Sequence, residues 1–341
     1  MFCRFAQHRD GAPSNVSPEF LAKCEHGRMV PVIDVSRSER TVARELDDVC
    51  TDVGFFQITG HGFDDGLLEQ TWSIVRAFFD LPLPERLDAA RPRPDYPFGY
   101  VPIAGETLSN SLGDGGLPDL KEIFNMGPVR RDPRTLADAD EELLLSPNLW
   151  PGSLPELQPI LEDYFLAMES LSARLLHLSA IGLGLESDFF TKRIDCGTSA
   201  LRALNYPSQE RESLPGQLRA GAHTDYGTLT ILRQDAAPGG LEVLDHSRSW
   251  MPVPSVDGAF VINVGDMLAQ WTNDRWRSTL HRVVNPEVGA PARRQSIAFF
   301  HNANFDCEVA CLPTCTSPTN PPRYAPVKAG PHLVSKFRRT G

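Results

Sequence analysis

The pattern of apolar and polar residues divides the chain into a helical first half and a second half of short strands. Apolar side chains recur at helical spacing in segments that begin near Ser38, Gly66 and Ser153. Ser153 and Glu156 also fit a capping box, which predicts the start of the longest helix. From about Ser199 the apolar runs are short and separated by turn residues, which predicts a β-rich half. The expected strands are 200–207, 227–234, 241–245, 250–254, 259–271, 279–286 and 293–302.

Two further apolar runs, "PVIDVS" at 31–36 and "GFFQITGHG" at 54–62, predict strands in the helical half. Residues 96–140 are low in periodicity, and we expect a long loop that covers a functional region. Residues 1–28 are polar, rich in breakers and without periodicity, so we expect a poorly ordered N-terminal extension. A start of translation at Met29 is a hypothesis that the intact mass of the natively expressed protein would test.

Many short strands at regular spacing are typical of a sandwich or barrel, and the helices show no second core of their own. We therefore expect an α+β fold with a mainly β core, in which N-terminal helices flank a jelly roll within one elaborated domain. The predicted divisions are an N-terminal region at 29–195, a jelly-roll core at 196–302 and a C-terminal tail at 303–341 that closes the site.

Composition excludes several classes of partner. The chain of 341 residues has a net charge of -11 and a sequence pI near 5.3, so it lacks the concentrated Lys/Arg surface of a nucleic-acid-binding protein. No apolar run approaches the roughly 18 residues that would indicate a membrane span, and the first residues contain no continuous apolar segment typical of a signal peptide. We expect a cytoplasmic protein with no nucleic-acid or membrane partner.

The cysteines do not predict a disulfide framework. There are 7 of them, an odd number spread over a long chain, which is typical of reduced thiols. Cys307, Cys311 and Cys315 have the loosest spacing of zinc ligands. However, a fourth ligand is missing and Pro313 interrupts the segment, so a packed or solvated loop is the favoured interpretation.

The stretch "GAHTDYGTLTIL" at 221–232 places His223 and Asp225 at the mouth of a predicted strand. In an extended chain residues i and i+2 point the same way, so the imidazole and the carboxylate share a face. His281, in "RSTLHRVVNP", is the candidate third ligand. Two histidines and one carboxylate on one side of a metal leave positions open, as non-haem Fe(II) oxygen chemistry requires. The His-x-Asp pair alone is a weak signal that an ordinary polar strand edge also explains.

Arg294 and Ser296, in "RRQSIAFF", are also spaced i and i+2 on a predicted strand. A guanidinium that points into an apolar barrel needs an anion, because a buried charge without a partner is strongly destabilising. A carboxylic acid that also reaches the metal would bind the guanidinium in a bidentate manner. A structural ion pair between Arg294 and an aspartate or glutamate is the alternative.

Together, His223, Asp225, His281 and the Arg294-x-Ser296 pair resemble the ligands of the isopenicillin N synthase-like family of Fe(II)- and 2-oxoglutarate-dependent dioxygenases. The resemblance covers nearly the whole chain from Met29. It is also carried by "PVIDVS", "GFFQITGHG", "PDLKEIFNMGP", "LRALNYP", "GDMLAQWTND", "LHRVVNP" and the tail segment "CLPTCTSPTNPPRYAPVKAG".

The resemblance implies a cupin-like double-stranded β-helix in which the two histidines and Asp225 bind Fe(II). It implies that Arg294 and Ser296 hold 2-oxoglutarate, with Tyr206 nearby as a hydrogen-bond donor. The implied reaction uses O2 and couples oxidative decarboxylation of 2-oxoglutarate to hydroxylation, desaturation or cyclisation of a small-molecule substrate, in secondary metabolism. We expect a monomer or a weak oligomer.

Three alternatives stay open at this point. Isopenicillin N synthase itself uses no 2-oxoglutarate, but the glutamine near its C-terminus has no counterpart in the tail "LVSKFRRTG", which favours the 2-oxoglutarate-dependent reaction. An ethylene-forming-type enzyme would fragment the oxoacid itself. A jelly-roll binding protein would keep the pocket without catalysis.

The sequence does not identify the primary substrate. Asn205, Tyr100 and Glu122 are candidates to face it, although hydrogen bonding within loops explains them equally well. We expect specificity to be determined by the region 96–127 and by the tail after Asn304, because loops around a rigid barrel commonly carry specificity.

Phe299 and Ile231 are candidates for an apolar lining that protects the metal-bound oxidant. Packing in the core explains both residues equally well.

Overall fold

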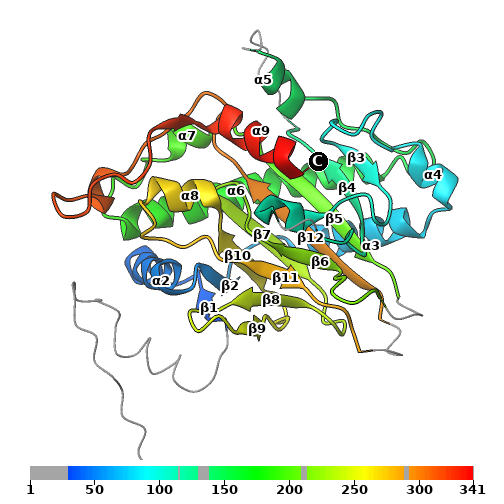
Figure 1. The fold of residues 1–341 in the computed structure, drawn as a ribbon, viewed down its shortest axis with the longest axis horizontal. Helices are drawn as coiled ribbons and strands as arrows, with labels where there is room; N and C mark the ends of the chain where they lie inside the picture. Colours follow the sequence, from blue (N-terminus) through cyan, green and yellow to red (C-terminus); the bar gives the residue numbers. More distant parts are fainter. Residues whose placement is uncertain (1–29, 114–115, 130–137, 209–212, 288–291, 341) are drawn as a thin grey trace, which may run out of the picture.

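The computed structural model describes residues 30–113, 116–129, 138–208, 213–287 and 292–340. Within these residues two β-sheets face each other, and long helices cover the far side of the larger sheet (Figure 1). The N-terminal extension expected at 1–28 lies outside the described residues. The two layers of strands form the jelly roll that positions the site.

The described residues form a larger sheet of eight strands and a smaller sheet of four strands. In spatial order, the larger sheet contains β1 (Val32–Asp34), β2 (Phe55–Thr59), β10 (Phe260–Val264), β7 (Leu229–Gln234), β12 (Arg294–His301), β5 (Ala200–Tyr206), β4 (Glu122–Met126) and β3 (Gly99–Val101). The smaller sheet contains β6 (Ala220–His223), β11 (His281–Val283), β8 (Leu241–Leu244) and β9 (Trp250–Pro252). From β5 to β12 the chain passes back and forth between the sheets, which produces the double-stranded arrangement.

Helices pack on the outer face of the larger sheet. The long helix α6 (Leu157–Gly182) lies behind the sheet and contacts both α2 (Glu39–Asp52) and α3 (Asp65–Asp80) (Figure 1). Ser38 caps α2 as expected, since its hydroxyl accepts a hydrogen bond from the backbone N–H of Thr41. The shorter helices are α4 (Leu83–Leu87), α5 (Ala139–Leu144), α7 (Thr191–Ile194), α8 (Asp266–Trp271), α9 (Ala329–Thr340) and the 3-10 helices η1 (Leu108–Leu112) and η2 (Pro313–Cys315).

Alternation along the central strand β12 assigns its side chains to two different cores. Ala298 and Phe300 belong to the apolar cluster between the two sheets, whereas Ile297 and Phe299 belong to the larger cluster under the helices. Successive strand residues point to opposite faces, so Arg294 and Ser296 share the inner face with Ala298. The inside of the jelly roll is therefore the face that carries the polar residues singled out in the sequence.

This alternation decides between the two interpretations of Phe299 and Ile231 in favour of packing in the core. The two residues are paired across β12 and β7, and both lie in the cluster on the helix side. The ring of Phe299 packs edge-on against Phe165 of α6, with ring centroids 5.0 Å apart. Phe300 and Leu232 occupy the inner face instead.

Two predictions about strands and loops were wrong. Residues 96–140 are not one long loop, because they include β3, η1, β4 and α5. The sequence does not predict β4, because this strand is buried on both faces and contains Glu122 and Asn125. It therefore lacks the alternation of apolar and polar residues that is typical of a strand. The predicted strand 259–271 is β10 followed by α8, and the chain turns at Gly265, where an added Cβ would lie 2.2 Å from the Gly227 carbonyl oxygen.

The long helix begins at Leu157 instead of Ser153, with Glu156 at its N-cap position. The predicted capping box does not form, because Glu156 has helical backbone angles and its side chain makes no capping hydrogen bond. The turns around Pro151 and Pro155 delay the helix by one turn.

The C-terminal segment folds back over the jelly roll. β13 (Glu308–Val309) and β14 (Val327–Lys328) pair with each other, and α9 then contacts η1 and α5. The ring of Phe337 in α9 lies 6.0 Å from the ring of Tyr226, measured between centroids. Tyr226 directly follows Asp225, so α9 packs against the loop that carries this candidate ligand.

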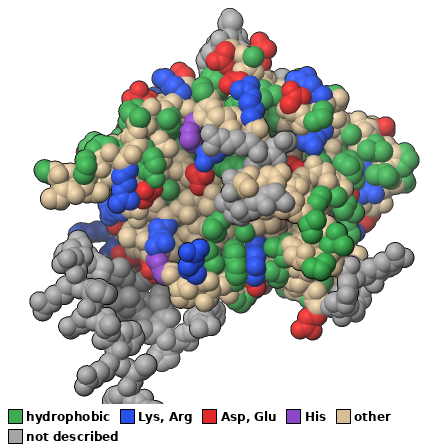
Figure 2. Space-filling model, in the orientation of Figure 1, with side chains coloured by type: hydrophobic (Ala, Val, Ile, Leu, Met, Phe, Trp, Pro, Cys, Tyr) green, Lys and Arg blue, Asp and Glu red, His purple; other side chains and the backbone are tan. Residues whose placement is uncertain are grey.

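Within the described residues, no helix is both long and apolar enough to cross a membrane. Lys/Arg and Asp/Glu side chains both occur over the face presented in Figure 2.

Candidate metal and cosubstrate site

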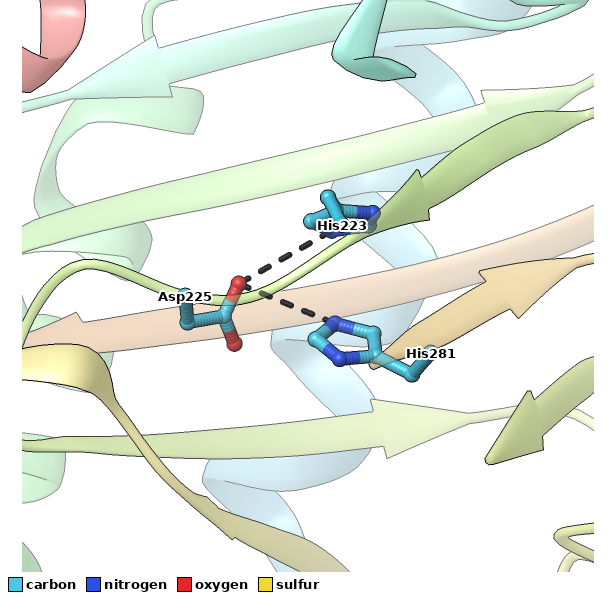
Figure 3. Close-up of side chains that lie close together, drawn as sticks. All are labelled: His223, Asp225 and His281. Atoms are coloured by element: carbon cyan, nitrogen blue, oxygen red, sulfur yellow. Dashed lines mark ion pairs between the residues drawn. The ribbon is translucent and has the colours of Figure 1, made fainter. Parts of the chain in front are cut away.

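His223, Asp225 and His281 come together inside the jelly roll (Figure 3). His223 ends β6 and His281 begins β11, and the two residues are directly paired across the smaller sheet. Asp225 lies in the connection from β6 to β7, just beyond the end of the strand. The Asp225 Oδ1 atom is 3.8 Å from Nε2 of His223 and 3.7 Å from Nε2 of His281.

Hydrogen bonds to neighbouring residues determine which atoms of the three side chains face one another. Nδ1 of His223 donates to the Gly221 carbonyl at 2.7 Å, and Nδ1 of His281 donates to the Thr279 carbonyl at 3.1 Å. Both Nε2 atoms are thereby left with free lone pairs. Oδ2 of Asp225 accepts hydrogen bonds from Thr230 at 2.6 Å and Asn263 at 2.8 Å, so Oδ1 is the oxygen that faces the imidazoles.

The protonation states suit a cation. Burial and, to a lesser extent, His281 lower the pKa of His223 to about 3 although Asp225 opposes the shift, so the His223 imidazole is neutral near pH 7. Burial acts to raise the pKa of Asp225, but the two imidazoles and the hydrogen bonds from Thr230 and Asn263 together lower it. Neutral imidazoles and an ionised carboxylate are the forms that bind a metal.

The donor set fits a single ion. Two metal–ligand bonds of about 2.1 Å span at most about 4.2 Å, and the separations from Oδ1 to the two Nε2 atoms lie within this limit. The three candidate ligand atoms all lie within 4.8 Å of one another. Two imidazoles and one carboxylate form the donor set typical of non-haem Fe(II), and within the described residues no cysteine joins them to favour zinc.

A buried guanidinium lies further along the same inner face. Arg294 is 1% exposed; its Nη2 donates to Oε1 of Gln234 at 2.7 Å, and its Nη1 lies 3.4 Å from the Ser296 hydroxyl. Its Cζ atom sits 5.0 Å from the centre of the Tyr206 ring, on the neighbouring strand. No carboxylate of a described residue forms an ion pair with Arg294, so the structural Arg–Asp or Arg–Glu bridge is not found among them.

Strand β7 connects the metal group with the guanidinium. Thr230, near the start of β7, binds Asp225, and Gln234, at its end, binds Arg294. Four residues along a strand span about 13 Å, and the side chains that reach inward from both ends shorten this gap. The candidate metal ligands and the guanidinium therefore contact the two ends of one strand, on the same inner face.

A second buried arginine, which the sequence did not single out, lies beside this group. Arg219 is fully buried, donates to the backbone carbonyls of Pro238, Gly239 and Ala292, and has its Cζ atom 5.9 Å from the centre of the Tyr206 ring. Burial lowers the pKa of Arg219 to about 10, and the charge of Arg294 contributes. No sequence pattern marks Arg219, because its role is to bind loop carbonyls that lie far from it in the chain.

Asn205, Tyr100 and Glu122 do not face the metal group. Glu122 and Asn205 are paired on β4 and β5 and point to the face opposite Tyr206. The Glu122 carboxylate accepts hydrogen bonds from Tyr100, Asn205 and Arg86. These residues form a structural cluster, which supports the hydrogen-bonding interpretation given above.

The comparisons with known proteins decide the family. Residues 30–153 match the model described as the N-terminal region of a non-haem dioxygenase in morphine synthesis, and residues 197–303 match the model of the 2OG-Fe(II) oxygenase superfamily. The chain belongs to the 2OG-Fe(II) oxygenase superfamily. Its enzymes are oxidoreductases that need Fe(II), 2-oxoglutarate and O2, so the expected enzyme class, cofactors and double-stranded β-helix fold are confirmed.

Relatives in this superfamily cover most of the chain. Validamycin A dioxygenase from Streptomyces hygroscopicus subsp. limoneus is 34% identical over 83% of this chain and 79% of its own length. Homoarginine-6-hydroxylase 2-ODD-233 from Oryza sativa subsp. japonica is 35% identical over 86% of this chain and 88% of its own. The solved structure of a full-length Neurospora crassa protein in complex with alpha-KG has a TM-score of 0.79 and 27% identity, and covers 91% of this chain and 95% of that one. The superfamily match and relatives described as 2-oxoglutarate-Fe(II) type oxidoreductases favour a 2-oxoglutarate-dependent dioxygenase over the isopenicillin N synthase-type oxidase.

Proposed function

We propose that His223, Asp225 and His281 bind Fe(II), and that Arg294 binds the distal carboxylate of 2-oxoglutarate with help from Ser296 and Tyr206. The proposal rests on the convergence of the free Nε2 and Oδ1 atoms of the three candidate ligands on one point. The buried guanidinium of Arg294 lies on the inner face of the same jelly roll. When bound, the iron and the oxoacid together supply O2 activation coupled to oxidative decarboxylation.

The side chains of this chain would hold the reactants and exclude water. Thr230 and Asn263 hold the Asp225 carboxylate so that one oxygen faces the metal, and the Gly221 and Thr279 carbonyls fix both imidazole rings. We propose that the substrate is a small molecule of secondary metabolism, which is hydroxylated, desaturated or cyclised. Substrate oxidation by homologous dioxygenases supports this assignment.

Succinate release tests the proposal. Fe(II)-loaded protein is expected to form succinate only when both 2-oxoglutarate and O2 are present, and a true substrate is expected to raise the rate on the order of tenfold or more. The screen uses homoarginine, validamycin A, and sets of small acids, peptides and phenolics. Failure to form succinate under every condition would contradict the assignment, and ethylene in the headspace would favour the fragmenting reaction instead.

We also propose that the tail after Asn304 closes the site. α9 packs over Tyr226, and Lys336 lies over the same ring with Nζ 5.5 Å from its centre. The predicted divisions at 29–195, 196–302 and 303–341 follow this division of roles, in which the core binds the metal and the tail limits access.

Ending the chain at Lys328 removes α9 and tests this role. Because lid closure excludes water and completes a site, we expect substrate oxidation to fall roughly tenfold or more while the Fe(II) dissociation constant changes less than about threefold. Tyr324→Phe is the control, since it removes a tail hydrogen bond to Asp274 without altering α9. Equal losses of Fe(II) binding and activity in the truncated protein would argue against a closing role.

A further inference from the structure

A group of charged residues, the ionic cluster, occupies the inner face beside the candidate metal site. Arg202 lies on β5 and shares its face with Leu204 and Tyr206. It is paired with Ala298 of β12 on one side and with Asn125 of β4 on the other. The other members of the cluster lie before and after β3 and just before β4; they are Arg91, Glu106, Asp119 and Lys121.

A continuous chain of contacts connects the ionic cluster with His223. The Gly221 carbonyl holds Nδ1 of His223, and the Gly221 N–H donates to Oδ1 of Asp119 at 2.9 Å. Oδ2 of Asp119 accepts a hydrogen bond from Lys121 at 2.7 Å, and Lys121 is 3.8 Å from Oε2 of Glu106. The same Glu106 oxygen accepts a hydrogen bond from Nη1 of Arg202 at 3.1 Å. The inner face also connects the two groups across the strands: Phe300, which lies beside Arg202, is paired with Thr230, the residue that binds Asp225.

The charges in the ionic cluster do not balance. Arg91, Lys121 and Arg202 supply three positive charges, whereas Glu106 and Asp119 supply two negative ones. Burial acts to raise the pKa of Glu106, but Arg202, Lys121 and Arg91 outweigh this effect and lower it, so the carboxylate is ionised and fully compensated. Among the described residues of the cluster, one positive charge is therefore left without a carboxylate, and a partly buried charge is more stable when it is paired.

Arg202 is the member whose guanidinium can accept a further partner. Its Nε donates to Asn125 at 2.8 Å and its Nη1 donates to Glu106, while within the described residues its Nη2 has no hydrogen-bond acceptor. The side chain is 21% exposed, in contrast to Lys121 at 1%. Its Cζ atom sits 5.7 Å from the centre of the Phe300 ring, which limits its orientation.

We propose that Arg202 recognises a carboxylate of the primary substrate, through its free Nη2 and the unbalanced positive charge of the ionic cluster. This inference rests on the proposed function, because it places the substrate between this guanidinium and the iron. It makes the enzyme an oxygenase of small carboxylic acids, amino acids included. Phe300, next to Arg202 on the inner face, would pack against the apolar part of such a substrate.

The experiment compares carboxylic acids with their primary amides in matched pairs, measured by substrate-stimulated succinate release. A charge-assisted hydrogen bond is worth about 1.5–3 kcal/mol, so kcat/KM for an acid is expected to exceed that for its amide on the order of 10–100-fold in the wild-type protein. Arg202→Gln should reduce this ratio to less than about threefold, and Arg202→Lys should keep part of it because the charge remains. Arg282→Gln is the matched control: Arg282 pairs with Glu242 on the smaller sheet, and its loss should leave the ratio unchanged.

Glu106→Gln separates an acidic substrate from a basic one. It removes a competing carboxylate, so acid substrates should bind equally well or more tightly.

Three results would each overturn the proposal. In the Glu106→Gln protein, acids could lose their stimulation of succinate release while neutral compounds gain it. The wild-type protein could use acids and amides equally, or Arg202→Gln could leave the acid-to-amide ratio of kcat/KM unchanged. The 2-oxoglutarate dissociation constant of Arg202→Gln, measured without O2, should stay within about threefold of the wild-type value, because the two ligands use different arginines. Failure of the wild-type protein to form any succinate would count against the proposed function itself, and is thus distinguishable.

Discussion

Replacing Asp225 with asparagine is expected to weaken Fe(II) binding by more than about a hundredfold and to abolish substrate oxidation. The loss of groups that merely orient a metal ligand typically costs 10–100-fold in affinity or activity, so the loss of the anionic ligand itself should cost more. Asparagine keeps the size of the side chain and can still bind Thr230 and Asn263, which leaves the local fold in place. Equilibrium titration with Fe(II) under anaerobic conditions measures the change.

Asp235→Asn is the matched control for this variant. Asp235 lies just after β7, at the opposite end of this strand from Asp225. Its carboxylate accepts hydrogen bonds from the backbone N–H groups of Gln295 and Ala237. It should bind Fe(II) as the wild-type protein does. Comparable Fe(II) affinities for Asp225→Asn and wild type would show that Asp225 is no ligand.

Replacing Arg294 with glutamine is expected to raise the 2-oxoglutarate dissociation constant by roughly a hundredfold or more, with Fe(II) binding unchanged. The guanidinium makes charge-assisted hydrogen bonds worth about 1.5–3 kcal/mol each, and glutamine supplies no charge. The melting temperature of the protein without 2-oxoglutarate should not fall, because the substitution removes a buried cation that has no carboxylate partner among the described residues and that lies near Arg219. A purely structural role for Arg294 predicts the opposite result for stability.

Arg293→Gln provides the control at the adjacent position. Arg293 points to the other face of β12, where it contacts Asp80 and donates to Asn205. Its loss should leave 2-oxoglutarate binding intact. An equal effect of the two substitutions would mean that general electrostatics, and not a specific contact, governs binding of the cosubstrate.

The metal group could be predicted from the sequence because its chemistry is concentrated in short segments. His223 and Asp225 are two residues apart, and Arg294 and Ser296 repeat the same spacing on a strand, where this spacing places side chains on one face. The same rule, applied further along β12, would have placed Phe299 on the helix side, since 294, 296, 298 and 300 share the inner face. The apolarity of Phe299 alone could not decide between lining of the site and packing in the core.

Other features depend on contacts between distant segments and left no local pattern. β4 contains a buried glutamate and a buried asparagine whose partners, Arg86 and Arg202, lie 36 and 77 residues away in the chain. The ionic cluster brings together the loops before and after β3, the residues just before β4, and β5. Its unbalanced charge emerges only when these segments are placed side by side, and no window of the sequence contains it.

An anaerobic titration of the Fe(II)-loaded protein with 2-oxoglutarate tests the proposed binding of both iron and oxoacid, and it is followed through the visible charge-transfer absorption of the complex. We expect a saturable band for the wild type and for Arg293→Gln, a band that needs far more 2-oxoglutarate in Arg294→Gln, and none in Asp225→Asn at the same concentration of iron. Absence of the band in the wild-type protein, or an unchanged titration in Arg294→Gln, would contradict the proposed site.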